Sequence, residues 1–367
     1  MKNTILRSTA SIALFLAVLC LLAVCAFHYP EFLSNPQMRK TYDVRQMRLL
    51  LLFSLYLSTA LSLIALFISP FKVLALIAIL LIAVASQLGG ASVPLPDSVR
   101  QKPIYLSLDL VILDLLFMSL IFVPLERFCH LHKRRFLRDG LSTDLAHYGL
   151  NHLMMGGVYY LVATPGNWLH HEVFQDKIPK LMGLLPIWAQ VLAMIFIADF
   201  FQYWVHRMFH TKNYLWQFHK IHHSTESMDW LASSRLHIVD VILTRSISFA
   251  PIVCLGFAER AVQIYLPIIS VQALFAHTNV KFMLGPLKYI ITTPLVHHWH
   301  HSSEKEALDK NFAVTFSCID VLFGTFYCPY RWPKKYGLYQ EKISENFLKQ
   351  LTYPFIKAGK SILRTNH

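Results

Sequence analysis

The chain has 367 residues, of which 55% are hydrophobic and only 15% are charged. This composition excludes an ordinary soluble domain, and it predicts an all-α integral membrane protein built as a multi-span helix bundle. The net charge of +13 would suggest nucleic-acid binding in a soluble protein. In a membrane protein it is explained by basic cytoplasmic loops, so no nucleic-acid partner is expected.

Eight apolar runs are long enough to be membrane-crossing helices. The first run follows Lys2 and Arg7, and Val24-x-Ala26 within it also resembles a signal-peptide cleavage site. Because the rest of the chain already reads as a membrane protein, a retained span is favoured over a cleaved signal. In chain order, the predicted spans are 9–27, 49–69, 73–92, 104–125, 145–164, 185–205, 238–256 and 260–280.

The densest basic segment between two predicted spans is 126–139, which should therefore lie in the cytoplasm. Counting spans from there also places the polar segments 211–237 and 281–367 on the cytoplasmic face, as a cap on the bundle. The expected organisation is N-terminal spans in 1–140, a histidine-rich domain in 141–330 and a basic C-terminal tail in 331–367. The basic side chains of the first segment are Arg127, Lys133, Arg134, Arg135 and Arg138.

Histidines are concentrated between residues 206 and 301, where eleven of the chain's nineteen occur. Most belong to three boxes in which neighbours are separated by three or four residues. On a helix such neighbours share one face, and paired imidazoles on one face are typical of a transition-metal site. Ordinary buried histidines are the alternative for any single pair. The boxes are His206 and His210; His219, His222 and His223; and His297, His300 and His301.

The number of candidate ligands predicts two metal ions. The boxes supply eight imidazoles, and His237 and His277 bring the set to ten, whereas one zinc site normally takes four protein ligands. Imidazole suits zinc, copper, iron and nickel, so the spacing does not choose the metal. His298 lies about 100° around a helix from His297, and we expect it to point away from the metals.

Four carboxylates are candidates to accept the second ring N–H of a ligand histidine and thereby orient it. Asp199 shares a helical face with Tyr203, His206 and His210, and we expect it, together with Asn311, to support catalysis. The other carboxylates are Asp240, Asp309 and Asp320.

These motifs resemble the fatty acid hydroxylase and sterol desaturase superfamily of membrane-bound di-iron oxygenases. The resemblance extends over about residues 140–330. In one departure, Ile238 and Asp240 stand where many sterol-acting members have Pro and Glu. The matching segments are Asp199 to His210, Trp216 to Ser224, Arg235-x-His237, Ala276 to Asn279, His297 to Phe312 and Asp320 to Thr325.

The resemblance implies two iron ions, O₂ and a hydroxylation or desaturation of a C–H bond in a fatty acyl, alkyl ether or sterol-like lipid. Zinc has no redox chemistry and would replace iron only on overexpression. An external reductase or electron carrier is implied: a ferredoxin, a cytochrome b5-like protein or a reduced pterin. From the residues alone, a dizinc membrane hydrolase acting on a lipid is the alternative, with Glu226 available as a general base.

Overall fold

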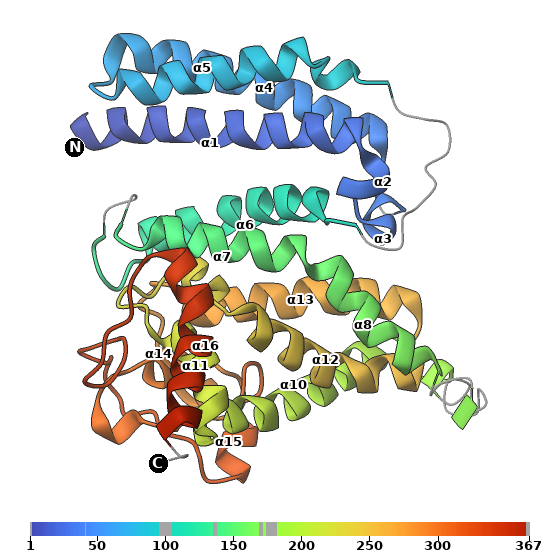
Figure 1. Cartoon of the computed structure of the whole chain (residues 1–367), viewed down its shortest axis with the longest axis vertical. Helices are drawn as coiled ribbons and strands as arrows, with labels where there is room; N and C mark the ends of the chain where they lie inside the picture. Colours follow the sequence, from blue (N-terminus) through green and yellow to red (C-terminus); the bar gives the residue numbers. More distant parts are fainter. Residues whose placement is uncertain are drawn as a thin grey trace. The chain divides into compact units, whose positions relative to one another are not determined.

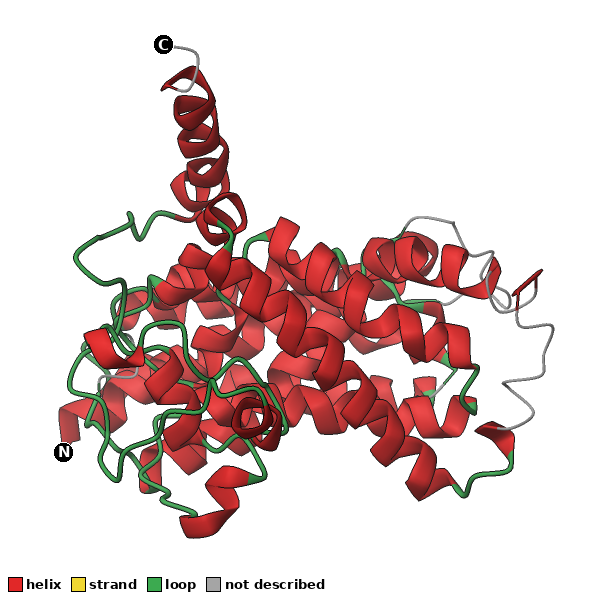
Figure 2. Cartoon of the chain, turned by 90° about the horizontal axis from the view of Figure 1, so that it is seen from below, coloured by secondary structure: helices red, strands yellow, loops and turns green. Residues whose placement is uncertain are grey.

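The computed structural model describes residues 2–40, 42–94, 105–134, 138–168, 172–173 and 182–364. Within these ranges the secondary structure is helical and contains no β-strand, which confirms the predicted all-α class (Figure 2). Arg135, one of the predicted basic residues, lies outside the described residues. The chain forms two compact units. The first comprises residues 1–117 and 152–157, and the second comprises residues 118–151 and 158–367.

The first unit is built on three long helices that pack against one another: α1 (Lys2–His28), α4 (Val44–Ile68) and α5 (Lys72–Gln87) (Figure 1). Small residues such as Ala17 and Ala78 are fully buried between them, which lets the helix backbones approach closely. The hydroxyl of Ser58 donates to the carbonyl of Ala13, 2.8 Å away, and so links α4 to α1. The short helices α2 (Pro30–Leu33) and α3 (Pro36–Arg39) follow α1.

The second unit is centred on α10 (Ile187–Thr211), which packs along α12 (Ile238–Leu255) and α13 (Glu259–His277) (Figure 1). Its core includes Met194, Ala198, Ile252 and Tyr265. Helix α6 (Leu108–Phe128) runs from the first unit into this one. The remaining helices are α7 (Leu141–Leu153), α8 (Met155–Trp168), α11 (Asn213–His223), α14 (Pro294–His300), α15 (Cys318–Leu322) and α16 (Phe347–Arg364).

Six of the described helices are long and apolar enough to cross a membrane: Thr9–His28, Val44–Ile68, Lys72–Ser92, Leu108–Phe128, Ile187–Thr211 and Ile238–Leu255. The prediction of a span over 145–164 is wrong, because the helix is interrupted at Met154 and α7 buries polar side chains such as His147 and Asn151. The run 260–280 does form α13, but this helix is not among the six. With six helices instead of eight, counting spans no longer fixes the face on which the histidines lie.

Candidate metal centre

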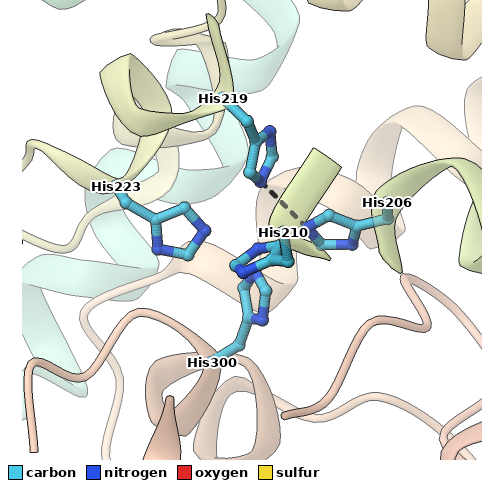
Figure 3. Close-up of side chains that lie close together, drawn as sticks. All are labelled: His206, His210, His219, His223 and His300. Atoms are coloured by element: carbon cyan, nitrogen blue, oxygen red, sulfur yellow. Dashed lines mark hydrogen bonds between the residues drawn. The ribbon is translucent and has the colours of Figure 1, made fainter. Parts of the chain in front are cut away.

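Nine of the ten histidines predicted as ligands converge in two adjacent groups. Within each group, one ring nitrogen of every member lies within 4.8 Å of those of the others. The first group, drawn in Figure 3, has five members and the second has four. The first comprises His206, His210, His219, His223 and His300, and the second comprises His222, His277, His297 and His301.

The five-histidine group is assembled by three helices. The last two turns of α10 present His206 and His210, and the chain then reverses at Lys212 into α11, which presents His219 and His223. The fifth member, His300, comes from the end of α14. The Nε2 atoms of His206 and His219 lie 3.0 Å apart, as the dashed line in Figure 3 marks.

The four-histidine group combines α11, α13 and α14. His277 is the last residue of α13, and its Nε2 lies 3.2 Å from that of His222 and 2.9 Å from that of His297. His301 caps α14, and its Nε2 lies 3.2 Å from that of His297. Because α11 and α14 contribute to both groups, the two groups are held as one rigid assembly.

The nitrogen atoms are spaced as ligands of a common ion would be. With metal–nitrogen bonds of about 2.1 Å, two ligands at a right angle have nitrogens about 3 Å apart. The measured separations of 2.9 to 3.2 Å fall at this value. Among the described residues, the buried Nε2 atoms of His210, His223 and His300 have no hydrogen-bond partner. A buried polar atom left without a partner costs about 1–3 kcal/mol, which metal coordination would offset.

The second ring nitrogen of several members faces a backbone carbonyl, and this fixes the tautomer. Nδ1 of His206 lies 2.7 Å from the carbonyl oxygen of Phe312, and Nδ1 of His300 lies 2.8 Å from that of Lys310. A carbonyl can only accept, so Nδ1 carries the proton and Nε2 keeps its lone pair. Nδ1 of His222 faces the carbonyl of Arg235 in the same way, at 3.3 Å.

Six imidazoles outside the membrane helices are held neutral. Burial, and then the neighbouring histidines, lower the pKa of five of them well below the usual value for histidine. Burial also lowers the pKa of His277 to about 4. Neutral rings with free lone pairs are the form that binds metal. The five are His222, His223, His297, His300 and His301.

Two of the four candidate carboxylates contact a histidine of the centre. Oδ2 of Asp240 lies 2.6 Å from Nδ1 of His219, and both side chains are buried. Oδ1 of Asp309 lies 3.3 Å from Nδ1 of His210, and the Asp309 side chain is 64% exposed. The closer and fully buried contact of Asp240 is the stronger orienting interaction.

Asp199 does not contact a histidine, contrary to the prediction. Its carboxylate accepts the backbone N–H groups of Val314, Thr315 and Phe316, at 2.9, 3.1 and 2.6 Å. Asp199 therefore fixes a segment of chain that follows Phe312, whose carbonyl orients His206.

Asp320 and Asn311 hold the same segment. Asp320 accepts the N–H groups of Phe312 and Ala313, at 2.7 and 2.9 Å. Asn311 donates to the carbonyls of Val296 and Tyr327 and adopts a left-handed backbone with φ of 59°. Asn tolerates this conformation better than most residues, which accounts for its place next to Phe312.

His237 and His298 lie outside both groups. His237 caps α12: its Nδ1 accepts the N–H of Val239 at 3.1 Å, and its Nε2 lies 3.1 Å from the carbonyl of Leu351. Both of its ring nitrogens therefore contact the backbone, whereas a metal ligand needs one nitrogen free to bind the ion. His298 points away from the groups, as its helical position predicts, and its Nε2 lies 3.0 Å from the carbonyl of Thr278.

A buried ion-pair network that sequence reasoning missed supports the second group. Arg235 is 1% exposed and pairs with Asp144 and Glu345, and Asp144 also pairs with Arg138. The network fixes the residue whose carbonyl faces His222. Arg235 belongs to a recognisable motif, but Asp144 precedes it by 91 residues, and no local pattern links the two.

The membrane helices and the buried imidazole groups together indicate a membrane protein with two all-histidine groups that could each hold a metal ion. A family model described as fatty acid hydroxylase matches residues 191–325, which include all nine histidines. This match agrees with the resemblance that the motifs indicate.

Three relatives with curated names illustrate the relationship. Ornithine lipid hydroxylase OlsE of Rhizobium tropici is 31% identical over 202 residues, 54% of this chain and 58% of that protein. Alkylglycerol monooxygenase of Homo sapiens is 34% identical over 129 residues, 35% and 28% of the two chains. Methylsterol monooxygenase 1-1 of Arabidopsis thaliana is 28% identical over 186 residues, 50% and 60% of the two chains.

The chain thus spans less than two thirds of each of these relatives. No solved structure matches the chain. The relatives are named as hydroxylases and monooxygenases of lipids, which are oxidoreductases.

Proposed function

We propose that the chain is a membrane-bound, O₂-dependent di-iron monooxygenase that hydroxylates a C–H bond in the hydrocarbon chain of a lipid. The observation that carries the proposal is the partition of nine buried imidazoles into groups of five and four. One ion cannot use nine ligands, and two ions held by shared helices can act together on one substrate.

The metal is inferred from the ligands and the reaction together. Imidazole nitrogen is a suitable ligand for iron, copper, nickel and zinc, but zinc has no redox chemistry. Oxidation of an unactivated C–H bond requires a redox-active metal, and a pair of irons with O₂ would supply the oxidising power. Glu226, the candidate base of a dizinc hydrolase, has an exposed side chain that pairs with Lys342 and lies outside both groups. No observation therefore favours the hydrolase.

The protein's own residues would hold and tune the centre. Backbone carbonyls and the Asp240 carboxylate accept hydrogen bonds from Nδ1 of His206, His300 and His219. The proton therefore stays on Nδ1, and the Nε2 lone pair of each ring would be free to bind the ion. The Asp240 and Asp309 carboxylates offset part of the positive charge that neutral imidazoles leave uncompensated. Burial of the ring nitrogens excludes bulk water, which protects a reactive oxidising centre from side reactions.

An apolar groove in the same unit as the centre supports a hydrocarbon substrate. It has a volume of about 220 Å³ and lies between α10 and α15, lined by Phe196, Phe200 and Phe323 among others. Phe323 stacks on Tyr203 with ring centroids 5.3 Å apart, and Tyr203 packs on Phe312. The Phe312 ring in turn lies 5.1 Å from that of His210. The rings of Phe323, Tyr203 and Phe312 thus connect the groove to the five-histidine group.

We further propose that the substrate is a polar lipid with a long acyl or alkyl chain. The ornithine lipid and alkylglycerol enzymes among the relatives support this class. Ile238 and Asp240 depart from the pattern of many sterol-acting members, which argues against a sterol. The electrons would come from a separate carrier, and the basic segment that follows α6 supports a cytoplasmic location of the centre.

Comparative lipid analysis tests the proposal. Membranes of cells that express the chain should contain a lipid one oxygen atom heavier than its precursor, dependent on O₂. The His222→Ala variant should abolish this product, whereas His130→Ala, an exposed histidine outside both groups, should not. A product two hydrogen atoms lighter would make the enzyme a desaturase. Lipids identical in the wild-type and His222→Ala cells, with iron bound in the purified wild type, would contradict the proposed reaction.

A further inference from the structure

The C-terminal helix α16 runs across the membrane helices of the second unit instead of along them (Figure 1). Seen from the other direction, it projects from the body toward the C-terminus (Figure 2). A helix perpendicular to the spans of a membrane protein is parallel to the membrane plane. This orientation raises the question of what covers its free faces.

Contacts in its first half fix the level of α16 relative to the bilayer. The rings of Phe355 and Phe218 lie 5.5 Å apart, which joins α16 to α11. Helix α11 begins two residues after the membrane helix α10 ends at Thr211. Helix α16 therefore lies where a span leaves the membrane, at the boundary between lipid and water.

The described side chains of α16 separate into an apolar and a basic face. Leu348, Leu351 and Phe355 are spaced by three and four residues and share one face. Leu348 is 68% exposed, and Phe355 remains 56% exposed beside Phe218, so the described residues leave most of this face uncovered. The exposed Lys357 lies about 180° around the helix from Leu348, and the exposed Lys349 lies about 100° from it. An apolar face and a lysine-bearing face are typical of helices that lie in the membrane interface.

Aromatic side chains at the same level favour lipid over a protein partner. Tyr214 in the first turn of α11 is 65% exposed, and Trp204 near the end of α10 is 39% exposed. Tyr and Trp with exposed rings are enriched where a membrane protein meets the headgroups. Lysines match the charge of anionic headgroups.

We infer that α16 is an interfacial membrane-binding helix: its Leu348 and Phe355 face enters the acyl boundary, and its lysines contact anionic lipid headgroups. The helix would seat the histidine-bearing part of the chain on the bilayer. Its first turns already contact that part, because Gln350 lies 2.9 Å from His147, and the carbonyl of Leu351 lies 3.1 Å from His237. The inference does not depend on the reaction proposed above.

Site-directed spin labelling of the full chain in lipid nanodiscs tests this inference. Single cysteines at Leu348 and Lys349 form a matched pair of neighbours on different faces, in a background whose native cysteines are replaced. Collision with O₂, which partitions into lipid, should dominate at Leu348→Cys, and collision with a water-soluble nickel chelate should dominate at Lys349→Cys. Equal nickel accessibility at both positions would overturn the inference.

A second experiment varies the lipid composition of the nanodisc. With phosphatidylglycerol in the nanodisc, the label at Leu348→Cys should be several-fold less accessible to nickel than in pure phosphatidylcholine. The Lys349→Glu, Lys357→Glu double variant, labelled at Leu348→Cys, should lose this difference. Protection of Leu348→Cys that is the same in both lipid compositions and unchanged in the double variant would mean that the lysines do not contact anionic headgroups, and this would also overturn the inference.

Discussion

Oδ2 of Asp240 lies 2.6 Å from Nδ1 of His219, and both side chains are buried. Thr244 donates a second hydrogen bond to the other carboxylate oxygen, at 3.0 Å. The Asp240 carboxylate is thus fixed in position on the first turn of α12 while it fixes the imidazole on α11. It links the start of a membrane helix to the five-histidine group.

We expect Asp240→Asn to fold but to lose about 10–100-fold in metal affinity or activity, because the amide removes the charge that polarises His219. Iron titration of the purified variant measures the affinity. Asp309→Asn is the matched control, and its effect should be smaller because Asp309 is exposed and its contact is 3.3 Å. Equal effects of the two substitutions would contradict the special role of Asp240.

Asp199→Asn should destabilise the segment that it holds instead of changing a histidine directly. An amide turned toward three backbone N–H groups brings its own N–H₂ against at least one of them, and a buried N–H without an acceptor costs about 1–3 kcal/mol. Hydrogen exchange of Val314, Thr315 and Phe316 should therefore accelerate in the variant. Unchanged protection of these amides, together with lost activity, would restore the original idea that Asp199 acts on the metal centre itself.

The buried pairs around Arg235 should contribute strongly to stability. Asp144→Asn leaves Arg235 and Arg138 without the carboxylate that they share, and removing one partner of a buried pair typically costs about 3–5 kcal/mol. The midpoint of thermal unfolding should fall, and metal occupancy of the four-histidine group should fall with it. Lys342→Ala, which removes an exposed ion pair, is the control and should have little effect.

The boxes could be predicted from sequence because their geometry is local: residues three or four apart on a helix share a face whatever surrounds them. The division into two groups could not. His222 and His223 are adjacent in sequence, yet they point to different groups, as do His300 and His301. Which ion each ring faces depends on how α11 and α14 pack, and no spacing encodes that packing.

Two other outcomes depended on contacts across long stretches of chain. Asp199 lies on the same helical face as His206, but its carboxylate oxygens accept hydrogen bonds from backbone amides more than a hundred residues later in the chain. His237 follows the motif of the family, but it caps α12 and turns its ring toward backbone atoms. The all-α class followed from composition, whereas the interruption of the helix at Met154, within an apolar run, did not.

The stability of the first turns of α16 should depend on pH, because these turns contact His147. This side chain is fully buried between the carbonyl of Leu236 and Gln350, and burial lowers its pKa to about 4. A histidine whose pKa is lower in the folded than in the unfolded state stabilises the fold above the unfolded pKa of about 6.5. That contribution is lost as the pH falls toward 4. The protection factors of the α16 amides, which are corrected for the intrinsic exchange rate at each pH, should therefore fall between pH 7 and pH 5, and the slope should shrink in His147→Gln.

Selective removal of ligands should empty one group at a time. The wild-type chain, purified without chelators, should bind close to two irons. His210→Ala removes a ligand that belongs only to the five-histidine group, and His277→Ala removes one that belongs only to the four-histidine group. Each variant should retain about one iron and no oxygenase activity, because the proposed reaction requires both ions.

His298→Ala separates coordination from burial in the same experiment. His298 is as buried as its neighbours, but its Nε2 faces the carbonyl of Thr278 and its Nδ1 lies 2.9 Å from the Tyr336 hydroxyl. The variant should lose about 1–3 kcal/mol of stability through these hydrogen bonds and still bind two irons. Metal analysis of the three variants, alongside their unfolding midpoints, decides the assignment. If His298→Ala loses iron to the same extent as His277→Ala, then general disruption of the core, and not loss of a ligand, explains the metal loss, and the two-group assignment is wrong.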